Sequence, residues 1–250
     1  MMEITALNNN LVKETVKLQQ KKYRTETGKF LLEGYKPISE AVGKIKLEYV
    51  FVLSEKLEKY KFLDCEIIKT NSAVLKKIST TESFPEAVGV GYQPDNNIEK
   101  LLKSKKVILL ENISDAGNLG TIIRSASAFN IDSIILFGNT VDLYNPKCVR
   151  SAVGNLWKIN IVHIEKIDVL KKIFADFERV ATLPKSSDSI WFKDWTPKEK
   201  CLVLFGSEAD GLSEELVKFA NKNITIEMGN RVESLNLGIS AGIVMYKLGI

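Results

Sequence analysis

Short apolar segments alternate with segments of helical character along most of this chain, and this alternation restricts the fold more than any other feature. It runs from residue 30 to the end of the 250-residue sequence and is typical of an α/β protein with a largely parallel sheet. We predict strands at residues 30–33, 49–53, 66–69 and 88–92, and again at 107–110, 133–137, 159–164, 179–183, 201–205 and 224–227. Helices fill the gaps, and in the second part they begin near Asn118, Pro146, Asp168, Ser213 and Ser234.

A polar stretch divides the chain into two parts. Residues 93–106, QPDNNIEKLLKSKK, contain Pro94 and precede a strongly apolar strand, which is typical of a domain boundary. We therefore predict a first domain at residues 1–95, a linker at 96–105 and a second domain at 106–250. The alternative is a surface loop within a single domain.

Charge and cysteine content exclude several protein classes. A formal net charge of +4 is compatible with a polyanionic partner but far from that of a histone-like binder. The three cysteines are widely spaced and odd in number, which argues against a disulfide framework or a metal knuckle. No apolar run reaches the length of a membrane span, and the N-terminus lacks the apolar stretch of a signal peptide. We predict a cytoplasmic protein that does not enter a membrane.

Two loops follow apolar strands and precede helices. Residues 109–124, LLENISDAGNLGTIIR, place Asn118 as the expected cap of a helix and Arg124 six residues later, within two turns. Residues 202–213, LVLFGSEADGLS, repeat the design with two glycines, Glu208 and the expected cap Ser213. Such loops at the carboxyl ends of strands indicate a shared ligand crevice. Taken singly, each loop is equally compatible with an ordinary cap and surface charges.

A third segment, residues 224–246, joins a strand through a polar loop to an apolar helix rich in glycine and alanine. None of the loops is GxGxxG, which argues against a dinucleotide-dependent oxidoreductase. The single histidine, His163, lies in the apolar run INIVHI, where a structural role is typical. No HExxH or paired Cys/His spacing is present, so we predict metal-free chemistry that does not depend on histidine.

Together the three segments resemble the signature motifs of the SpoU (TrmH-like) family of RNA 2′-O-ribose methyltransferases, in the family's order. The patterns are Asn-x-Gly-x-x-x-Arg, Gly-x-Glu-x-x-Gly-Leu and Glu-Ser-Leu-Asn. The matching residues are Asn118, Gly120 and Arg124; Gly206, Glu208, Gly211 and Leu212; and Glu233, Ser234, Leu235 and Asn236. The segment NPKCVRSAVG at 145–154 also resembles the family's intermediate stretch.

The resemblance implies a trefoil-knotted SPOUT catalytic domain that binds S-adenosylmethionine, needs no metal and forms a homodimer. It implies a catalytic group of Asn118, Arg124, Glu208, Ser234 and Asn236. The cofactor would contact Leu204, Gly206, Ile226, Met228 and Leu235. One departure is that relatives often carry Asn-Val-Ser-Val where this chain has Asn236-Leu237-Gly238-Ile239, so we expect a looser start to the last helix.

The N-terminal part is similar to an L30e-like domain, a type of RNA binder that implies a substrate-binding role. Because such domains are commoner among relatives that modify ribosomal RNA, the resemblance implies ribosomal RNA as the substrate more than tRNA. A basic segment could follow an RNA backbone while Tyr23 stacks on an unpaired base, or it could be a solvated helix face. Its cations are Lys13, Lys17, Lys21, Lys22, Arg24 and Lys29. A non-catalytic RNA-binding protein is the remaining alternative.

Overall fold

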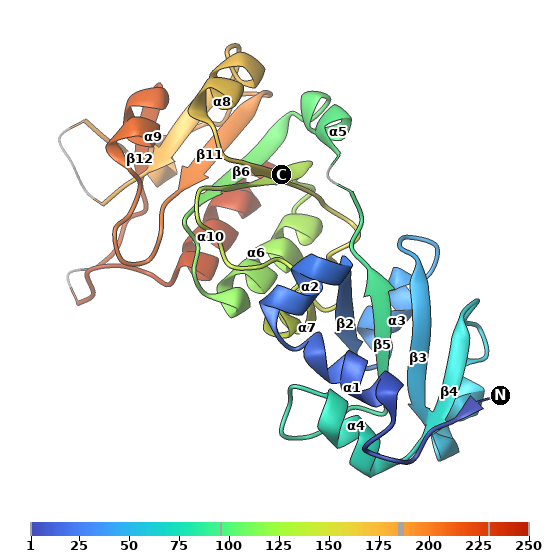
Figure 1. The fold of residues 1–250 in the computed structure, drawn as a ribbon. Coiled ribbons are helices and arrows are strands. Elements are labelled where there is room, and N and C mark those ends of the chain that lie inside the picture. Colours follow the sequence, from blue (N-terminus) through green and yellow to red (C-terminus); the bar gives the residue numbers. More distant parts are fainter. Residues whose placement is uncertain (1, 96, 185–187, 230, 250) are drawn as a thin grey trace. The chain divides into compact units, whose positions relative to one another are not determined.

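A computed structural model describes residues 2–95, 97–184, 188–229 and 231–249 and divides the chain into two compact units (Figure 1). The first consists of Met1–Asp95 with Asp142–Trp157, and the second of Asn96–Val141 with Lys158–Ile250. The chain therefore passes from one unit to the other three times. The sequence-based division at residues 95 and 106 stays a prediction, and compactness groups the later segment 142–157 with the first unit.

Unit 1 is built around a mixed sheet whose strand order is β1-β4-β3-β5-β2. β1, β4 and β3 pair in parallel, whereas β5 runs antiparallel to both of its neighbours. The strands are β1 Met2–Glu3, β2 Lys29–Glu33, β3 Leu47–Leu53, β4 Glu66–Thr70 and β5 Ala87–Tyr92. The helices are α1 Asn10–Lys17, α2 Lys21–Thr27, α3 Tyr35–Ala41, α4 Ser72–Ile78 and α7 Pro146–Ser151, with the 3-10 turn η1 at Ser54–Tyr60.

Local signals in the sequence explain where these helices begin and end. The side chains of Asn9 and Asn71 cap α1 and α4 by accepting backbone N–H groups. Gly28 ends α2 in the left-handed region with φ +64°, which glycine adopts without a Cβ penalty. One face of the sheet then packs against α1 and α4 in a core that includes Phe51 and Ile68.

Segment 142–157 is held to unit 1 by aromatic packing and two ion pairs. The Phe30 ring lies 4.9 Å from that of Tyr144 and 5.6 Å from that of Trp157. Arg24 pairs with Asp142 at 2.6 Å, and Arg150 pairs with the buried carboxylate of Glu33 at 3.0 Å. Because buried charges are costly unless paired, these contacts specify where the segment packs.

Unit 2 contains a sheet of parallel strands in the order β10-β12-β9-β11-β6-β7-β8. The strands are β6 Lys106–Glu111, β7 Ser133–Phe137, β8 Asn160–Ile164, β9 Glu178–Thr182, β10 Ile190–Trp191, β11 Cys201–Phe205 and β12 Lys222–Thr225. The helices are α5 Ile98–Leu102, α6 Ala116–Ala128, α8 Ile167–Ile173, α9 Glu214–Phe219 and α10 Leu237–Gly249, with the 3-10 turn η2 at Phe192–Asp194. Strand order does not decide whether the chain threads a loop, so the trefoil knot stays a prediction.

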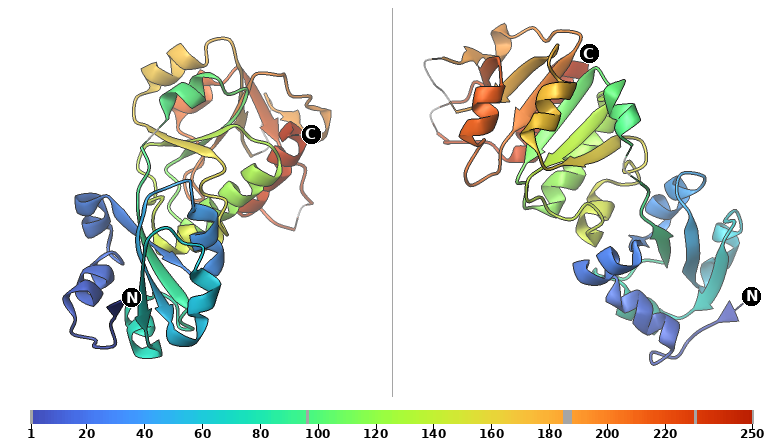
Figure 2. Two further views of the ribbon diagram at one scale, coloured as in Figure 1. Left: turned by 90° about the vertical axis from the view of Figure 1, so that its right-hand side faces the viewer. Right: turned by 45° about the horizontal axis from the view of Figure 1, so that its top comes forward.

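Helices cover both faces of the unit 2 sheet (Figures 1 and 2). On one face, Leu170 of α8 and Leu216 of α9 join alternate strand residues such as Leu109 and Leu204 in a continuous core. α6 and α10 pack against each other on the other face. Leu101 of α5 belongs to the first of these cores, so part of the stretch predicted as a linker is helical and anchored in unit 2.

The principal strands confirm the predicted α/β pattern. β7 and β11 coincide with residues 133–137 and 201–205, and the other predicted strands overlap observed ones. β1, β10 and α5 are short elements that the pattern missed. The last helix begins at Leu237 rather than near Ser234, because Asn236 occupies its cap.

Candidate active site

The two motif loops lie at neighbouring carboxyl ends of the unit 2 sheet. β6 and β11 pair in parallel with Leu110 opposite Phe205, so the loops that follow them leave the same edge side by side. This edge is where parallel α/β sheets bind their ligands. The strand after which the third motif begins, β12, is two places away, beside β9.

The helix of the first motif, α6, is capped by a different residue from Asn118, which the sequence predicted. Asp115 is the cap of α6, and its carboxylate accepts the N–H of Asn118 at 2.7 Å. Asn118 lies in the first turn, so its side chain is free for other partners. Its Nδ2 donates to Glu208 Oε1 at 2.5 Å, and its Oδ1 accepts from Asn236 Nδ2 at 3.0 Å. One asparagine therefore joins all three motifs.

The second motif forms a tightly closed loop that only glycine permits at its first position. A Cβ on Gly206 would lie 1.9 Å from the backbone carbon of Gly211. Ser207 and Gly211 exchange backbone hydrogen bonds of 3.2 and 3.1 Å, and Gly211 adopts φ +69°. The loop presents the exposed side chain of Glu208 at its turn, and Ser213 caps α9 as predicted.

The third motif meets the first through the start of α10. Asn236 Oδ1 accepts the N–H groups of Gly238 at 2.9 Å and Ile239 at 3.3 Å, which makes it the cap of this helix. Asn236 therefore holds the start of this helix, and a looser start than in relatives stays a prediction. A Cβ at Gly238 would lie 3.4 Å from Thr121 of α6, so the small residue also allows the two helices to approach.

Two predicted catalytic residues stand apart from this hydrogen-bonded group. Arg124 is exposed on α6, and within the described ranges its guanidinium makes no hydrogen bond or ion pair. Ser234 is exposed in the loop before α10. The structure thus joins Asn118, Glu208 and Asn236 directly, and leaves Arg124 available to a ligand.

The predicted cofactor residues combine apolar side chains with accessible backbone. Ile226 and Leu235 are half-buried in the loop between β12 and α10, and Met228 in the same loop is 37% exposed. Leu204 is fully buried in β11, two residues before Gly206, and belongs to the core on the α8 and α9 face of the sheet. Half-buried apolar groups and a loop with exposed backbone fit an adenosine-containing ligand that backbone groups recognise.

Sequence reasoning missed Glu111, the last residue of β6. Its side chain is buried, and Oε2 accepts the N–H of Ser213 at 2.7 Å, which ties the second motif loop to the end of β6. The sequence feature that could have revealed Glu111 is that a charged residue ends an otherwise apolar strand.

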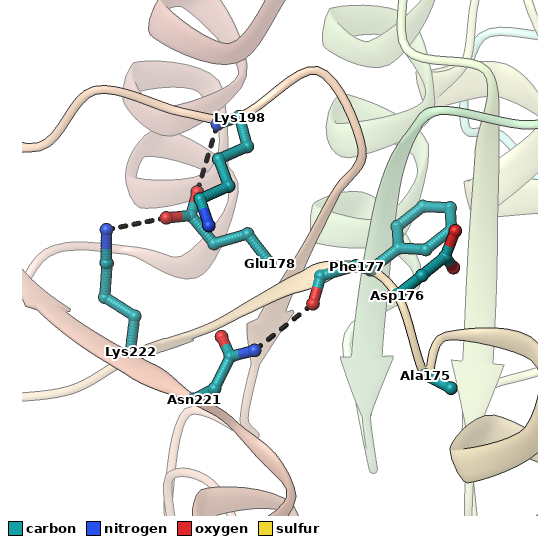
Figure 3. A pocket seen from close by; sticks show the side chains of 7 residues that line it. All are labelled: Ala175, Asp176, Phe177, Glu178, Lys198, Asn221 and Lys222. Atoms are coloured by element: carbon teal, nitrogen blue, oxygen red, sulfur yellow. Dashed lines mark hydrogen bonds and ion pairs between the residues drawn. The ribbon is translucent and has the colours of Figure 1, made fainter.

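A recessed surface lies elsewhere in unit 2, at the amino ends of β9 and β12 (Figure 3). Glu178 is its buried centre, where Lys222 pairs with Oε1 at 2.6 Å and Lys198 donates its backbone N–H to Oε2 at 3.1 Å. Burial opposes ionisation, yet these contacts hold the pKa of Glu178 below its ordinary value. Because its carboxylate already has partners, and the recess lies at the edge opposite the motif loops, we assign it a structural role.

Metal and histidine chemistry find little support in the arrangement of side chains. Across the described residues, no three His, Cys, Asp or Glu side chains gather as a metal site would require. His163 is exposed on β8, and its Nε2 lies 3.1 Å from the carbonyl oxygen of Gly138. Metal-free catalysis stays a prediction.

Among the described residues, no helix has both the length and the apolar character needed to cross a membrane.

Comparison with known families agrees with this geometry. The model of the SpoU rRNA Methylase family matches residues 105–246, and that of the MRM3-like substrate binding domain matches residues 9–89. The first match covers more than half of the chain and includes all three motifs. The chain belongs to the SpoU rRNA methylase family.

Individual relatives match over nearly the full length. The chain is 27% identical to the 23S rRNA (guanosine(2553)-2′-O)-methyltransferase RlmP of Bacillus subtilis, with 99% of each chain covered. It is 25% identical to the 23S rRNA (uridine(2479)-2′-O)-methyltransferase of Streptomyces viridochromogenes, covering 98% of this chain and 90% of the relative. The AdoMet-bound rRNA methyltransferase from Sinorhizobium meliloti has a similar structure, with TM-score 0.87, 28% identity and coverage of 98% and 96%.

Proposed function

We propose that this protein transfers a methyl group from S-adenosylmethionine to a ribose 2′-hydroxyl of ribosomal RNA. The observation that carries the proposal is the hydrogen-bonded chain Glu208–Asn118–Asn236, which joins the three family motifs at one edge of the sheet. Two relatives covered over 90% or more of their length are named 23S rRNA 2′-O-methyltransferases. Ribosomal RNA is accordingly favoured over tRNA, which remains the alternative substrate.

Cofactor binding falls to the loops after β11 and β12. Backbone groups of Gly206, Ile226 and Leu235 would read the adenine edge, and Met228 would supply apolar contact. The side chain of Leu204 is fully buried in the core, so Leu204 would act only by supporting the end of β11. When bound, S-adenosylmethionine supplies a methyl group activated by its sulfonium. A solved relative with AdoMet, AviRb of Streptomyces viridochromogenes, has TM-score 0.85 and 25% identity to this chain.

The reaction also requires the 2′-hydroxyl to lose a proton as its oxygen attacks the methyl carbon. Arginine is a poor base at neutral pH because its pKa lies above about 12. We therefore assign Arg124 to the adjacent phosphate and to the developing alkoxide. Glu208 is the candidate proton acceptor among these side chains, with water or a phosphate oxygen as alternatives, and Asn118 and Asn236 hold it in place. Ser234 completes the group as a proposed substrate contact.

This division of roles is tested with Arg124→Lys. If arginine only stabilises charge, the pH–rate profile keeps its shape and reaches a lower maximum. A shift of the limiting pKa in the profile would instead assign proton transfer to Arg124.

RNA binding by unit 1 is the second part of the proposal. Lys13, Lys17, Lys21 and Lys22 lie on α1 and α2 and make up the basic face. Lys17 pairs with Glu14 at 2.7 Å and Lys22 lies 3.9 Å from Glu26, and such exposed pairs are weak enough for an RNA phosphate to replace the carboxylate. The ammonium groups of Lys17 and Lys22 lie 5.7 and 5.8 Å from the centroid of the Tyr23 ring. This arrangement suits phosphates beside a stacked base.

Two residues of the basic segment are corrected by their contacts. Arg24 is only 2% exposed and is used by Asp142 and the carbonyl of Leu18. Lys29 is half-buried and pairs with Glu48 at 2.7 Å. Neither cation is available to an RNA backbone.

We also propose a homodimer, on the basis of α10. Ile239 and Tyr246 are 56% and 59% exposed, and Ile243 between them is half-buried. Their spacing places all three on one helical face, and an exposed apolar stripe of this kind suits a second copy. Light scattering at micromolar concentration tests this, and a monomer would contradict it.

For the compartment we propose the cytoplasm, where bacterial ribosomes and their RNA are found. Ribose-methylation mapping across ribosomal and transfer RNA in a strain that lacks the protein tests the substrate. Loss of a methyl group from ribosomal RNA is expected, and loss from tRNA alone would overturn the assignment.

A further inference from the structure

Exposed aromatic rings gather at one edge of unit 1, away from the basic face. At this edge β3 ends and β5 begins, where the N–H of Leu53 donates to the carbonyl of Glu86. Tyr35 follows β2 and is 38% exposed, and Phe62 follows η1 and is 45% exposed. Their ring centroids lie 5.9 Å apart at an interplanar angle of 75°. The two rings are therefore packed edge to face and are both partly exposed to solvent.

A buried tyrosine supports these two rings from below. Tyr60 is fully buried, and its ring centroid lies 5.7 Å from that of Tyr35 and 6.4 Å from that of Phe62. Its hydroxyl donates to Glu86 Oε1 at 3.0 Å. Burial and the adjacent carboxylate both raise the pKa of Tyr60, so the hydroxyl remains a donor. The rings are therefore held in place before any partner arrives.

One lysine completes the support. Lys59 Nζ lies 4.2 Å from the centroid of Tyr35, in cation–π geometry, and pairs with Glu86 at 2.5 Å. Glu86 thus fixes both Tyr60 and Lys59, and through them the orientation of Tyr35. Because these side chains are already ordered, little of their conformational freedom is lost when a flat ligand stacks on them.

The charge around the rings is close to balanced. Lys36 pairs with Glu40 at 2.6 Å, Lys61 pairs with Glu58 at 2.7 Å, and Lys59 is used by Glu86. Lys17 and Lys22 of the basic face are paired as well, so charge alone does not set this surface apart. What the surface offers is π-stacking, which every nucleobase can use.

We propose that Tyr35 and Phe62, supported from below by the buried Tyr60, form an aromatic platform that stacks an unpaired base of the RNA substrate. The proposal rests on the proposed RNA-methylating function. The matched substrate binding domain, residues 9–89, contains all three rings, and recognition of RNA by proteins commonly uses splayed bases stacked on Tyr and Phe. A single-stranded loop or bulge is therefore the partner, held at the platform by its base and at the basic face by its phosphates.

The test uses the full-length protein and the double variant Tyr35→Ala/Phe62→Ala. The substrate is protein-free ribosomal RNA from a strain that lacks the enzyme. Stacking of one base changes affinity by roughly 5- to 150-fold, so we expect the KM for RNA to rise within that range. Maximal rate at saturating RNA and the Kd for S-adenosylmethionine stay unchanged. The single variant Tyr35→Phe keeps both aromatic rings, so its KM for RNA should equal that of the wild type.

Three controls separate stacking from other causes. Leu7→Ala removes another exposed apolar side chain of unit 1, 43% exposed, and should leave the KM unchanged. The fold-change should be the same at 50 and 200 mM salt, because stacking does not release counterions. If the double variant fails to fold, Phe62→Ala alone is measured, since Phe62 is the more exposed ring.

The outcomes distinguish this proposal from the proposed function. An unchanged KM on bare RNA, with methylation lost only on ribosomal particles, would identify a protein partner and overturn the platform. If the wild type methylates no RNA, the proposed function fails. The platform is then judged by fluorescence of a single-stranded oligonucleotide carrying 2-aminopurine: quenching by the wild type and not by the double variant supports it, and equal fluorescence overturns it.

Discussion

One polar network in unit 1 and one in unit 2 use their side chains in opposite ways. In unit 1 the charged groups with the most partners are buried: Glu33 is 6% exposed and Arg24 is 2% exposed. They hold segment 142–157 against the rest of the unit. In unit 2 the network of Asn118, Glu208 and Asn236 lies at the sheet edge, with Glu208 and Asn236 exposed in loops and Asn118 half-buried in the first turn of α6.

This difference separates structural from chemical use of polarity. A buried ion pair is costly to break because each partner would be left unpaired in a poorly solvated site. An exposed network contributes less to stability but remains accessible to a substrate. Substitutions in the buried network of unit 1 should therefore act mainly on folding, and those in the exposed network of unit 2 mainly on turnover.

The largest expected effect is on stability, at Glu33. Its carboxylate accepts from Ser79 Oγ at 3.0 Å and Thr80 Oγ1 at 2.6 Å and pairs with Arg150. Glu33→Ala should lower the free energy of unfolding by about 3–5 kcal/mol, measured by urea denaturation. Lys218→Ala breaks the exposed pair with Glu214 and should cost less than about 1 kcal/mol. Equal effects would remove the contrast between buried and exposed pairs.

The next effect is on turnover, at Arg124. Arg124→Ala removes the proposed stabiliser of developing charge, and we expect kcat to fall by about 10²–10³-fold. The unfolding midpoint and the Kd for S-adenosylmethionine should not change, because the exposed Arg124 side chain makes no hydrogen bond or ion pair within the part of the chain that the structure describes. Lys103→Ala, another exposed cation of unit 2, serves as the control. A fall in stability that matches the loss of activity would speak against a chemical role.

A smaller effect is expected on cofactor binding, at Gly206. In Gly206→Ala the new Cβ would overlap the backbone of Gly211, so the loop must open. We expect the Kd for S-adenosylmethionine to rise by about tenfold or more, a change of about 1.4 kcal/mol or more, by calorimetry. Gly242→Ala adds a Cβ that meets only Ser125 Oγ at 3.9 Å and should bind the cofactor normally. Normal binding by Gly206→Ala would exclude this loop from the cofactor site.

The smallest effect concerns pH and Glu178, which is buried in unit 2 without a catalytic role. Because its folded pKa lies below the ordinary value of 4.5, the carboxylate stabilises the fold above about that pH and ceases to do so as pH falls through the lower folded pKa. Glu178→Gln should be less stable than wild type at pH 7, and the difference should shrink in acid. Glu165→Gln, at an exposed position, should show no such dependence. A difference that stays constant with pH would point to packing instead of charge.

Deletion of residues 1–95 is a poor test of the same contrast. Segment 142–157 would lose the partners of Tyr144, Trp157 and Arg150, so a loss of activity would report misfolding as well as lost RNA binding. Point variants on the basic face and on the aromatic platform avoid this difficulty.

The sequence alone determined the periodic elements and the residues of the three motifs. The strands at 133–137 and 201–205 could be read directly because each is a run of apolar residues bounded by polar ones. The order of the motifs relative to parallel strands also predicted a common edge for the first two. These features depend on neighbours a few residues apart, and that is the range over which a sequence pattern carries information.

Only the tertiary structure decided which side chains meet. Asn118 could have been the helix cap, and its place was taken by Asp115, which left the asparagine amide free to join Glu208 and Asn236. The sequence alone placed Arg24 in the exposed basic segment. In the structure Arg24 is buried and pairs with Asp142, which lies 118 residues away along the chain. Such pairings depend on which distant segments the fold brings together. A buried charge must be paired, and the partner that packing places beside it can lie at any separation along the sequence.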